Sequence, residues 1–325
     1  MLVVATGTYP APASPPSGLI PVSDGAGKVL AVGKDVSTVQ VGSRVVTHLA
    51  ANWLHGEIGN AMQATALGGG RDGVLAKHVV LDQYNLLPIP EHLSYREAAS
   101  LPVAGLTAFH CLFGHAGKTV QPGQTVLIEG TGGVSIAALQ LALSAGARPI
   151  VISSSDDKLK LVQKLGVPAG DCVNYSSDRD WAQTVRKLTP RGQGVDHTIE
   201  IAGGPTLTRA LLATKSYGCC WIVGYLGTSS KGPGDENLPD VAVAVLYSQA
   251  QLQGVLCGSY ALFQQYLDAH ELAEQNVRNK VASFNVLKPL ILDEQVYTFA
   301  DAKKAFEVQG SGKFVGKIII DVAAN

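Results

Sequence analysis

The sequence predicts an α/β protein in which a doubly wound parallel sheet is inserted between two parts of a mostly-β domain. Two observations carry this prediction. Between residues 125 and 257, short apolar segments rich in β-branched residues alternate with helical segments, some of which end at a glycine. On both sides of this region, short strand patterns are separated by glycine and proline. The 325 residues are enough for about two domains.

The first hundred residues are expected to be rich in β-strands. Strand or extended patterns occur at 29–32, 44–47, 74–81 and 85–90. Ser94 and Glu97 have the spacing of a capping box, so a helix is expected to begin after Ser94. Pro102 interrupts the apolar helical run, which resumes over 105–113.

The middle of the chain alternates between strands and helices. Strands are expected over 125–129, 149–153, 171–174, 195–200, 219–224 and 252–257. Helices are expected over 136–145 and 157–165, ended by Gly146 and Gly166. The last section returns to β character, with strands over 295–299 and 317–322 around a helix over 301–308.

A glycine-rich loop follows the first central strand, where residues 125–135 read TVLIEGTGGVS. One glycine permits a tight turn, another lets backbone N–H groups approach a pyrophosphate, and the following helix N-terminus supplies unpaired donors. Ser135 takes the place of a third glycine and is small enough for close helix–strand packing. The residues expected to contact a dinucleotide here are Gly130, Thr131, Gly132, Gly133 and Val134. A purely structural turn is the alternative.

The end of the second central strand indicates which dinucleotide is bound. Sites for NAD place an acidic residue about 20 residues after the first glycine, where it binds the ribose 2′-OH. This place holds Ser153, Ser154 and Ser155, followed by Asp156, Asp157 and Lys158. Hydroxyl groups beside a lysine tolerate a 2′-phosphate, so NADP(H) is expected. The two aspartates begin a helix, where carboxylates are common, but an aspartate turned inward would weaken the preference.

Composition and charge exclude several functional classes. The formal net charge of −1 gives no electrostatic basis for binding nucleic acid or an anionic membrane. No segment approaches the roughly 18 apolar residues that a membrane helix needs, and the N-terminus has no secretory signal pattern, so a cytoplasmic protein is expected. The five cysteines have no CxxC spacing and are interpreted as reduced, buried side chains.

Taken together, these segments resemble the medium-chain dehydrogenase/reductase superfamily, in its zinc-free alcohol-dehydrogenase-like and quinone-reductase-like branch. The matching segments are 7–10, 20–27, 52–53, 67–69, 99–108, 130–135, 174–175, 194–200 and 316–318. The resemblance implies a GroES-like catalytic domain from residues 1–100 and 278–325. It also implies a Rossmann NADP-binding domain from 101–277, a cofactor in the cleft between them, and a homodimer.

The resemblance implies roles for further residues, each with a packing or turn-forming role as the alternative. Those expected to contact the cofactor are Thr107 and Tyr175, the loop of Gly224, Tyr225 and Leu226, and the turn of Cys257, Gly258 and Ser259. Thr107 matches a threonine on the nicotinamide side. Tyr9 is the best candidate for a hydroxyl that orients the substrate or donates a proton. Asp24 and Trp53 are further candidates for residues facing the cleft.

Two departures from the superfamily's pattern bear on the chemistry. Zinc-dependent relatives carry Gly-His-Glu where this chain has Val22, Ser23 and Asp24, and the four-cysteine structural lobe is absent. Because serine is a poor zinc ligand, catalysis without zinc is expected. The chain also begins at a segment that lies further into the catalytic domain of relatives, so this domain is expected to be incomplete at its N-terminus.

The expected function is NADP(H)-dependent transfer of a hydride to an activated C=C bond or a quinone, without a metal. Such catalysis depends on positioning the nicotinamide, excluding water and stabilising a developing enolate. The enzymatic alternative is an NADP(H)-dependent alcohol/carbonyl oxidoreductase. The alternative of another class is a catalytically impaired NADP(H)-binding protein. A small-molecule substrate is expected, but its identity depends on loops that vary freely between such enzymes.

Overall fold

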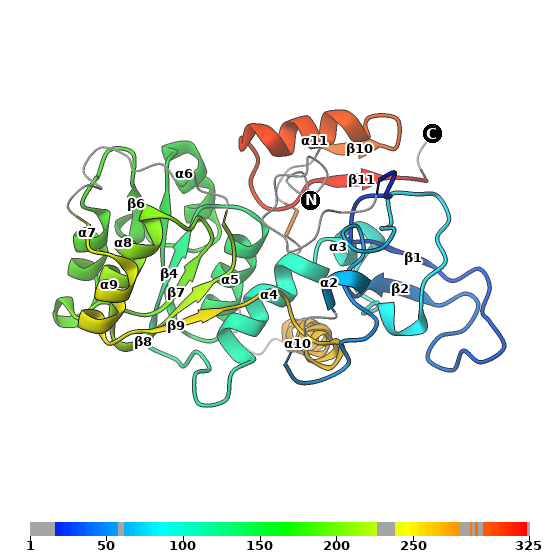
Figure 1. Cartoon of the computed structure of the whole chain (residues 1–325), viewed down its shortest axis with the longest axis horizontal. Coiled ribbons are helices and arrows are strands. Elements are labelled where there is room, and N and C mark those ends of the chain that lie inside the picture. Colours follow the sequence, from blue (N-terminus) through cyan, green and yellow to red (C-terminus); the bar gives the residue numbers. More distant parts are fainter. Residues whose placement is uncertain are drawn as a thin grey trace. The chain divides into compact units, whose positions relative to one another are not determined.

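The computed structural model describes residues 17–57, 62–225, 238–279, 287, 290–291 and 295–323. The chain forms two compact units (Figure 1). One comprises Met1–Leu106, Cys257–Phe284 and Lys288–Asn325, and the other comprises Thr107–Leu256 and Asn285–Leu287. Tyr9 and Leu226 lie outside the described residues. Among the described helices, none is long and apolar enough to cross a membrane.

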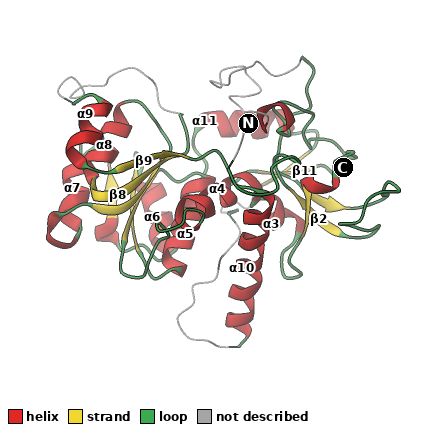
Figure 2. Ribbon diagram, turned by 60° about the horizontal axis from the view of Figure 1, so that its bottom comes forward, coloured by secondary structure: helices red, strands yellow, loops and turns green. Residues whose placement is uncertain are grey.

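The second unit is built on a six-stranded parallel sheet (Figure 2). Its strands are β4 (Thr125–Glu129), β5 (Arg148–Ser153), β6 (Cys172–Asn174), β7 (Val195–Glu200), β8 (Thr214–Ile222) and β9 (Gln251–Gly254). Their order in the sheet is β6-β5-β4-β7-β8-β9, which is 3-2-1-4-5-6 counted along the chain. This is the order of doubly wound nucleotide-binding sheets, and it reverses between β4 and β7. The predicted fold class is confirmed.

Helices connect these strands and cover the sheet. They are α5 (Gly133–Ser144), α6 (Asp156–Lys164), α7 (Trp181–Leu188), α8 (Pro205–Ala213) and α9 (Val241–Ser248). All five residues of β4 are buried, in keeping with its apolar centre, and Leu127 and Cys220 belong to a core shared with α7 and α8. All five cysteines are free; four of them are buried, as the sequence predicted, whereas Cys172 is partly exposed.

The first unit contains the β-rich parts of the chain. Its strands are β1 (Ala26–Lys28), β2 (Arg44–Thr47) and β3 (Leu86–Pro88), which form an antiparallel sheet, and the parallel pair β10 (Val296–Thr298) and β11 (Ile319–Asp321). Its helices include α2 (Met62–Thr65), α3 (Tyr95–Ala99), α10 (Tyr260–Arg278) and α11 (Ala302–Ser311), while α4 (Pro102–Phe113) contains the boundary with the second unit. One short 3-10 turn, η1 (Gln83–Asn85), lies in the first unit. Two others, η2 (Ala169–Asp171) and η3 (Pro190–Gly192), lie in the second unit.

The predicted capping box at Ser94 and the predicted interruption of the helix at Pro102 are confirmed. Ser94 caps α3, since its hydroxyl accepts a hydrogen bond from the Glu97 N–H at 3.3 Å. The Glu97 carboxylate in turn accepts one from the Ser94 N–H at 2.7 Å, which completes the capping box. Pro102 is the first residue of α4, where its missing N–H costs nothing.

Two predicted strands of the first unit are wrong. The strand expected over 29–32 ends earlier, at Lys28, and Leu30 and Val32 are exposed. Residues 74–81 form no strand, because only the start of this segment bonds to another segment, with the Val74 N–H donating to the Val22 carbonyl at 2.7 Å. The apolar residues that predicted the strand have no buried face, and the side chain of Val80 is 99% exposed.

The structure also divides the chain differently from the predicted boundary at residue 277/278. Residues 257–279 lie in the first unit. A backbone hydrogen bond and a side-chain contact hold the start of this segment there. Tyr260 N–H donates to the Trp53 carbonyl at 2.8 Å, and a ring nitrogen of His48 lies 2.9 Å from the Gly258 carbonyl oxygen. The apolar pattern of α10 predicts a buried helix face without indicating the domain that buries it.

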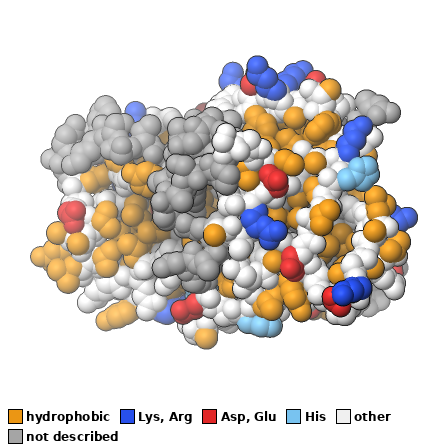
Figure 3. All heavy atoms as spheres, turned by 45° about the vertical axis from the view of Figure 1, so that its right-hand side comes forward, with side chains coloured by type: hydrophobic (Ala, Val, Ile, Leu, Met, Phe, Trp, Pro, Cys, Tyr) orange, Lys and Arg blue, Asp and Glu red, His pale blue; other side chains and the backbone are white. Residues whose placement is uncertain are grey.

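Charged side chains of both signs lie on the face drawn in Figure 3. On the face drawn in Figure 3, the described Lys and Arg side chains are interspersed with Asp and Glu among apolar and neutral atoms. This distribution agrees with the formal net charge of −1.

Candidate nucleotide-binding site

The loop after β4 turns sharply at Gly130. This residue has a φ of +70°, which favours glycine, and its N–H donates to the Ile152 carbonyl of β5 at 2.7 Å. A Cβ at Gly130 would also lie 3.1 Å from Cδ1 of Ile201. The glycine is therefore required by both backbone conformation and packing, and it places the loop at the carboxyl ends of β4, β5 and β7.

The next residues leave open space at the start of α5. Gly132 is the N-cap residue, no side chain caps the helix there, and a Cβ at Gly132 would meet no atom within 4 Å. Thr131 and Ser135 are buried, and the Ser135 hydroxyl donates to the Glu129 carbonyl at 2.7 Å. Serine thus ties the helix to the strand, as expected for close packing. Uncapped N–H groups facing open space fit the phosphates of a dinucleotide.

The three serines at the end of β5 are placed differently from one another. Ser153 is buried, and its hydroxyl oxygen lies 3.4 Å from the Ser155 N–H that donates to it. The Ser155 hydroxyl caps α6 by accepting from the Lys158 N–H at 3.4 Å. Ser154 is exposed, and Lys158 is partly buried, which lowers the pKa of its amine. Ser154 and Lys158 therefore remain the side chains suited to a ribose phosphate.

The two aspartates that follow are exposed and engaged in different contacts. The Asp156 carboxylate accepts a hydrogen bond from the side-chain amide of Asn174 at 2.7 Å, at the end of β6. Asp157 forms an ion pair with Lys160 at 3.0 Å within α6. Asp156 is thus turned toward the ends of β5 and β6, which is the placement that weakens the preference for NADP(H).

Two further predicted residues, Gly224 and Tyr225, lie against the start of the loop after β7. A Cβ at Gly224 would lie 2.5 Å from the Ile201 carbonyl oxygen, so only glycine allows this backbone approach. At Gly203, which has a φ of +73°, an added Cβ would lie 2.6 Å from the ring of Tyr225. The loops after β7 and β8 therefore pack together at the carboxyl edge of the sheet.

The remaining predicted residues are spread over several elements. Tyr175 is 39% exposed, and its N–H donates to the Ser153 carbonyl at 3.1 Å. Thr107 is buried in α4, while Gly133 and Val134 are partly exposed in the first turn of α5. In the first unit, Cys257 is fully buried and the Ser259 hydroxyl caps α10, next to Gly258.

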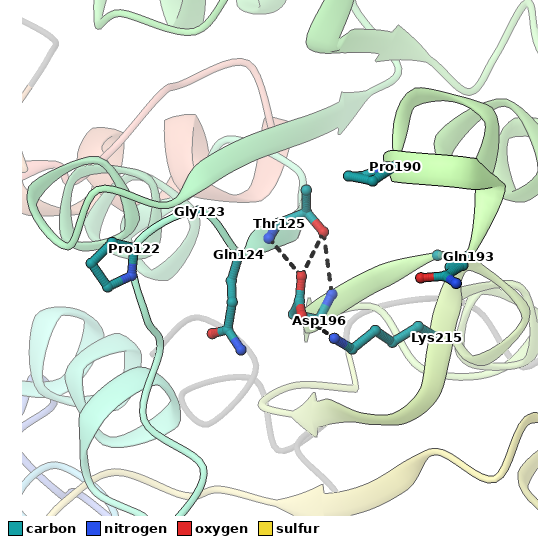
Figure 4. A pocket seen from close by; sticks show the side chains of 9 residues that line it. Pro122, Gly123, Gln124, Thr125, Pro190, Gln193, Asp196 and Lys215 are labelled. Atoms are coloured by element: carbon teal, nitrogen blue, oxygen red, sulfur yellow. Dashed lines mark hydrogen bonds and ion pairs between the residues drawn. The ribbon is translucent and has the colours of Figure 1, made fainter.

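A cavity of about 410 Å³ lies at the opposite, amino end of the same sheet (Figure 4). There the Asp196 carboxylate accepts hydrogen bonds from the Thr125 N–H at 2.8 Å and the Thr125 hydroxyl at 3.0 Å, and it forms an ion pair with Lys215. Although burial opposes ionisation, Lys215 and Thr125 lower the pKa of Asp196. These contacts tie β4 to β7 and β8 at the end away from the glycine-rich loop.

Comparison with known proteins is consistent with this geometry. Residues 2–91 match the alcohol dehydrogenase GroES-like domain, and residues 133–273 match the family of zinc-binding dehydrogenases. A zinc-type alcohol dehydrogenase-like protein of Schizosaccharomyces pombe is 35% identical over 321 residues, which are 99% of this chain and 86% of the relative. The chain belongs to the medium-chain dehydrogenase/reductase superfamily.

As a member of this superfamily, the protein is an oxidoreductase. Two further similarities bear on its chemistry. Quinone oxidoreductase-like protein 2 of Bos taurus is 34% identical over 204 residues, covering 62% of this chain and 51% of the relative. A solved structure described as an NAD-dependent alcohol dehydrogenase is 29% identical, with a TM-score of 0.78, covering 99% of this chain and 88% of that one.

The residues that stand where zinc-dependent relatives carry Gly-His-Glu, Val22 to Asp24, do not fit a catalytic zinc ion. The Ser23 hydroxyl is buried and donates to the Asp24 carboxylate at 2.6 Å, while the other Asp24 oxygen lies 2.7 Å from the Lys317 ammonium. The serine at the place of the histidine is thus bonded to a carboxylate that already pairs with a lysine. Among the residues that the structure describes, no group of three His, Cys, Asp or Glu side chains is arranged to hold a metal. Trp53 is buried, with its indole N–H donating to the Gly56 carbonyl at 2.9 Å.

The sequence reasoning missed a pair of buried glutamates in this dehydrogenase/reductase. Glu129 ends β4 and is 4% exposed, and Glu200 ends β7 and is 0% exposed. Burial raises the pKa of Glu129 well above its usual value, and the neighbouring Glu200 raises it further. Burial also raises the pKa of Glu200. Both residues end predicted strands, but only the order of the sheet brings those strand ends together.

Proposed function

We propose that this oxidoreductase binds NADP(H) at the Gly130–Val134 loop and transfers a hydride to an activated C=C bond or a quinone without a metal ion. The observation that carries the proposal is the combination of open, uncapped backbone at Gly132 with a β5 end that offers Ser154 and Lys158. When bound, the cofactor supplies the hydride.

The chain's own groups have distinct roles in binding. Backbone N–H groups at the start of α5 receive the pyrophosphate, where the helix dipole favours negative charge. Ser154 and Lys158 receive the 2′-phosphate of the ribose, which compensates the partial burial of the lysine amine. The closely packed loops at Gly203 and Gly224 shape the neighbouring part of the sheet edge.

Reduction without zinc is supported by the residues that replace the zinc motif. The Asp24 carboxylate accepts a hydrogen bond from Ser23 and forms an ion pair with Lys317, so its charge is already neutralised by a lysine of the chain. Reduction of a quinone or enone by hydride requires positioning and stabilisation of the developing oxyanion, with no obligatory Lewis acid. The name of the bovine relative supports a quinone as the acceptor class.

A second candidate is an NAD(H)- or NADP(H)-dependent alcohol/carbonyl oxidoreductase. The observation that favours NAD(H) is Asp156, whose carboxylate is directed toward the ends of β5 and β6 by Asn174. Similarity to the NAD-dependent alcohol dehydrogenase structure and to the zinc-type relative of S. pombe supports the carbonyl reaction.

Nucleotide titration tests the proposed cofactor. Binding of NADPH and NADH is measured by fluorescence for wild type, Lys158→Ala and the control Lys160→Ala, since Lys160 is exposed and pairs with Asp157. Loss of a charged phosphate contact is expected to weaken NADPH binding about tenfold or more in Lys158→Ala, with little change for NADH. Tighter NADH binding by wild type, together with its loss in Asp156→Ala, would reverse the cofactor assignment.

A panel of acceptors tests the reaction. Quinones and enones are expected to be reduced with a chelator present, while aldehydes and ketones react slowly. Faster carbonyl reduction that the chelator abolishes would overturn the metal-free proposal. Tight nucleotide binding with no turnover of any acceptor would instead identify a catalytically impaired nucleotide-binding protein.

A further inference from the structure

Glu129 and Glu200 lie side by side at the point where the strand order of the sheet reverses. β4 and β7 are neighbours, and their register pairs Leu127 with Thr198 and Ile128 with Ile199. The next residues in this register are Glu129 and Glu200. Neighbouring strands are about 4.8 Å apart and paired residues point to the same face, so the two carboxyl groups lie together.

The hydrogen bonds of the pair are unequal. One oxygen of Glu200 accepts from the Ala202 N–H at 3.1 Å, the Gly203 N–H at 2.7 Å and the Thr206 hydroxyl at 3.1 Å. Within the part of the chain that the structure describes, the other Glu200 oxygen and both Glu129 side-chain oxygens are buried without a hydrogen-bond partner. Such buried acceptors are costly, and two adjacent carboxylates also repel each other.

A single proton removes the repulsion and pairs two of these three oxygens. If Glu129 is protonated, its O–H can donate to the second oxygen of Glu200, and the repulsion between the two groups disappears. Glu200 is the member that stays ionised, because three donors already converge on it. Among the described residues, Cys220 on β8 interacts electrostatically with both glutamates, and it also interacts with Cys219 and with Cys111 of α4. Burial keeps the Cys220 and Cys111 thiols neutral by raising the pKa of each.

The pair connects two loops of the nucleotide site. Glu129 directly precedes Gly130, and its carbonyl accepts from Ser135 at the start of α5. The carboxylate of Glu200 fixes the backbone at Ala202 and Gly203. We propose that Glu129 and Glu200 share one proton that holds these two loops in their nucleotide-binding arrangement, and that loss of this proton weakens nucleotide binding.

The sign of the pH effect follows from the burial of Glu129. Because its pKa is raised in the folded state, the folded chain holds a proton that the unfolded chain has lost above the usual glutamate value. Stability therefore falls as pH rises from that value through the folded-state pKa. Ionisation at alkaline pH also places a second negative charge beside a site for an anionic pyrophosphate.

The variant Glu129→Gln tests the shared proton. Glutamine keeps the size and a donor toward Glu200 but cannot ionise, and Glu271→Gln on the exposed side of α10 is the matched control. Infrared spectroscopy is expected to show the carbonyl band of a protonated carboxylic acid in wild type and Glu271→Gln, and its loss in Glu129→Gln. The Tm of Glu129→Gln is expected to rise relative to wild type with increasing pH, while the control stays parallel to wild type.

Nucleotide binding gives the third measurement and rests on the proposed function. The Kd of wild type for NADPH is expected to rise at least tenfold between about pH 7 and about pH 10, with a flatter profile in Glu129→Gln. Absence of the infrared band together with parallel Tm profiles would overturn the shared proton. A flat wild-type Kd profile would overturn the link to the loops. No nucleotide binding at any pH would refute the proposed function, while the infrared titration of wild type would still decide the shared proton.

Discussion

His270 makes the first unit sensitive to acid. Its side chain is 1% exposed within α10, its ring lies edge-on to Tyr266 at 4.9 Å, and neither ring nitrogen has a hydrogen-bond partner among the described residues. Burial and, to a smaller extent, the neighbouring His92 lower the pKa of His270 to about 3. Because the pKa is about 6.5 in the unfolded chain, the unfolded state binds an extra proton between about pH 6.5 and about pH 3.

Stability is therefore expected to fall as pH falls through this window. From pH 8 to pH 5, His270 alone should lower the free energy of unfolding by about 2 kcal/mol, because 1.5 pH units below about 6.5 correspond to about 2 kcal/mol. Denaturant unfolding at both pH values is the assay, with His270→Leu as the test and the exposed His78→Gln as the control.

The quantity to compare among the variants is the change in the free energy of unfolding between pH 8 and pH 5. His270→Leu should lose about 2 kcal/mol less than wild type on acidification, whereas His78→Gln should match wild type. Some acid sensitivity remains in His270→Leu, because burial also lowers the pKa of His197 to about 4. An unchanged acid dependence in His270→Leu would show that the imidazole reaches water or a partner, and the reasoning from its burial would fail.

Three further substitutions test particular contacts by thermal or denaturant unfolding. Val22 has a φ of +75°, which is strained for a β-branched residue, so Val22→Gly should raise stability by up to about 1 kcal/mol, whereas the exposed Val41→Gly should lower it. Lys215→Ala should cost about 1–2 kcal/mol, since it leaves the mostly buried Asp196 without its ion pair, and an unchanged stability would refute that role. Gly130→Ala should cost about 1–2 kcal/mol and weaken nucleotide binding, because φ is +70° there; retained nucleotide affinity would contradict the placement of the loop.

The central sheet was predictable from the sequence because its signals are local. The strands over 125–129 and 195–200 have the bounds of β4 and β7, and the apolar β-branched centre of β4 is a local signal for a buried parallel strand. The predicted helices over 136–145 and 157–165 were displaced by one to three residues at their starts from α5 and α6. Each of these elements depends on neighbours in the chain.

Features that depend on distant partners were not predictable. Residues 74–81 carry a strand-like pattern, but pairing with another strand decides whether such a segment becomes one. The proximity of Glu129 and Glu200 follows from sheet order, which no local pattern contains. Likewise, the sequence placed three serines at the end of β5, but the backbone there decides that Ser153 points into the protein and Ser154 does not.

The ion pair between Asp24 and Lys317 has a consequence for synthesis on the ribosome. The two residues are 293 positions apart, so the first unit cannot complete this contact until Lys317 has been translated. At about 5–20 residues per second, the N-terminal segment waits about 15 to 60 s for its partner. The parallel sheet, contained within Thr107–Leu256, can form during this interval. Asp24 and the strands that follow it are therefore made well before the lysine that neutralises this carboxylate.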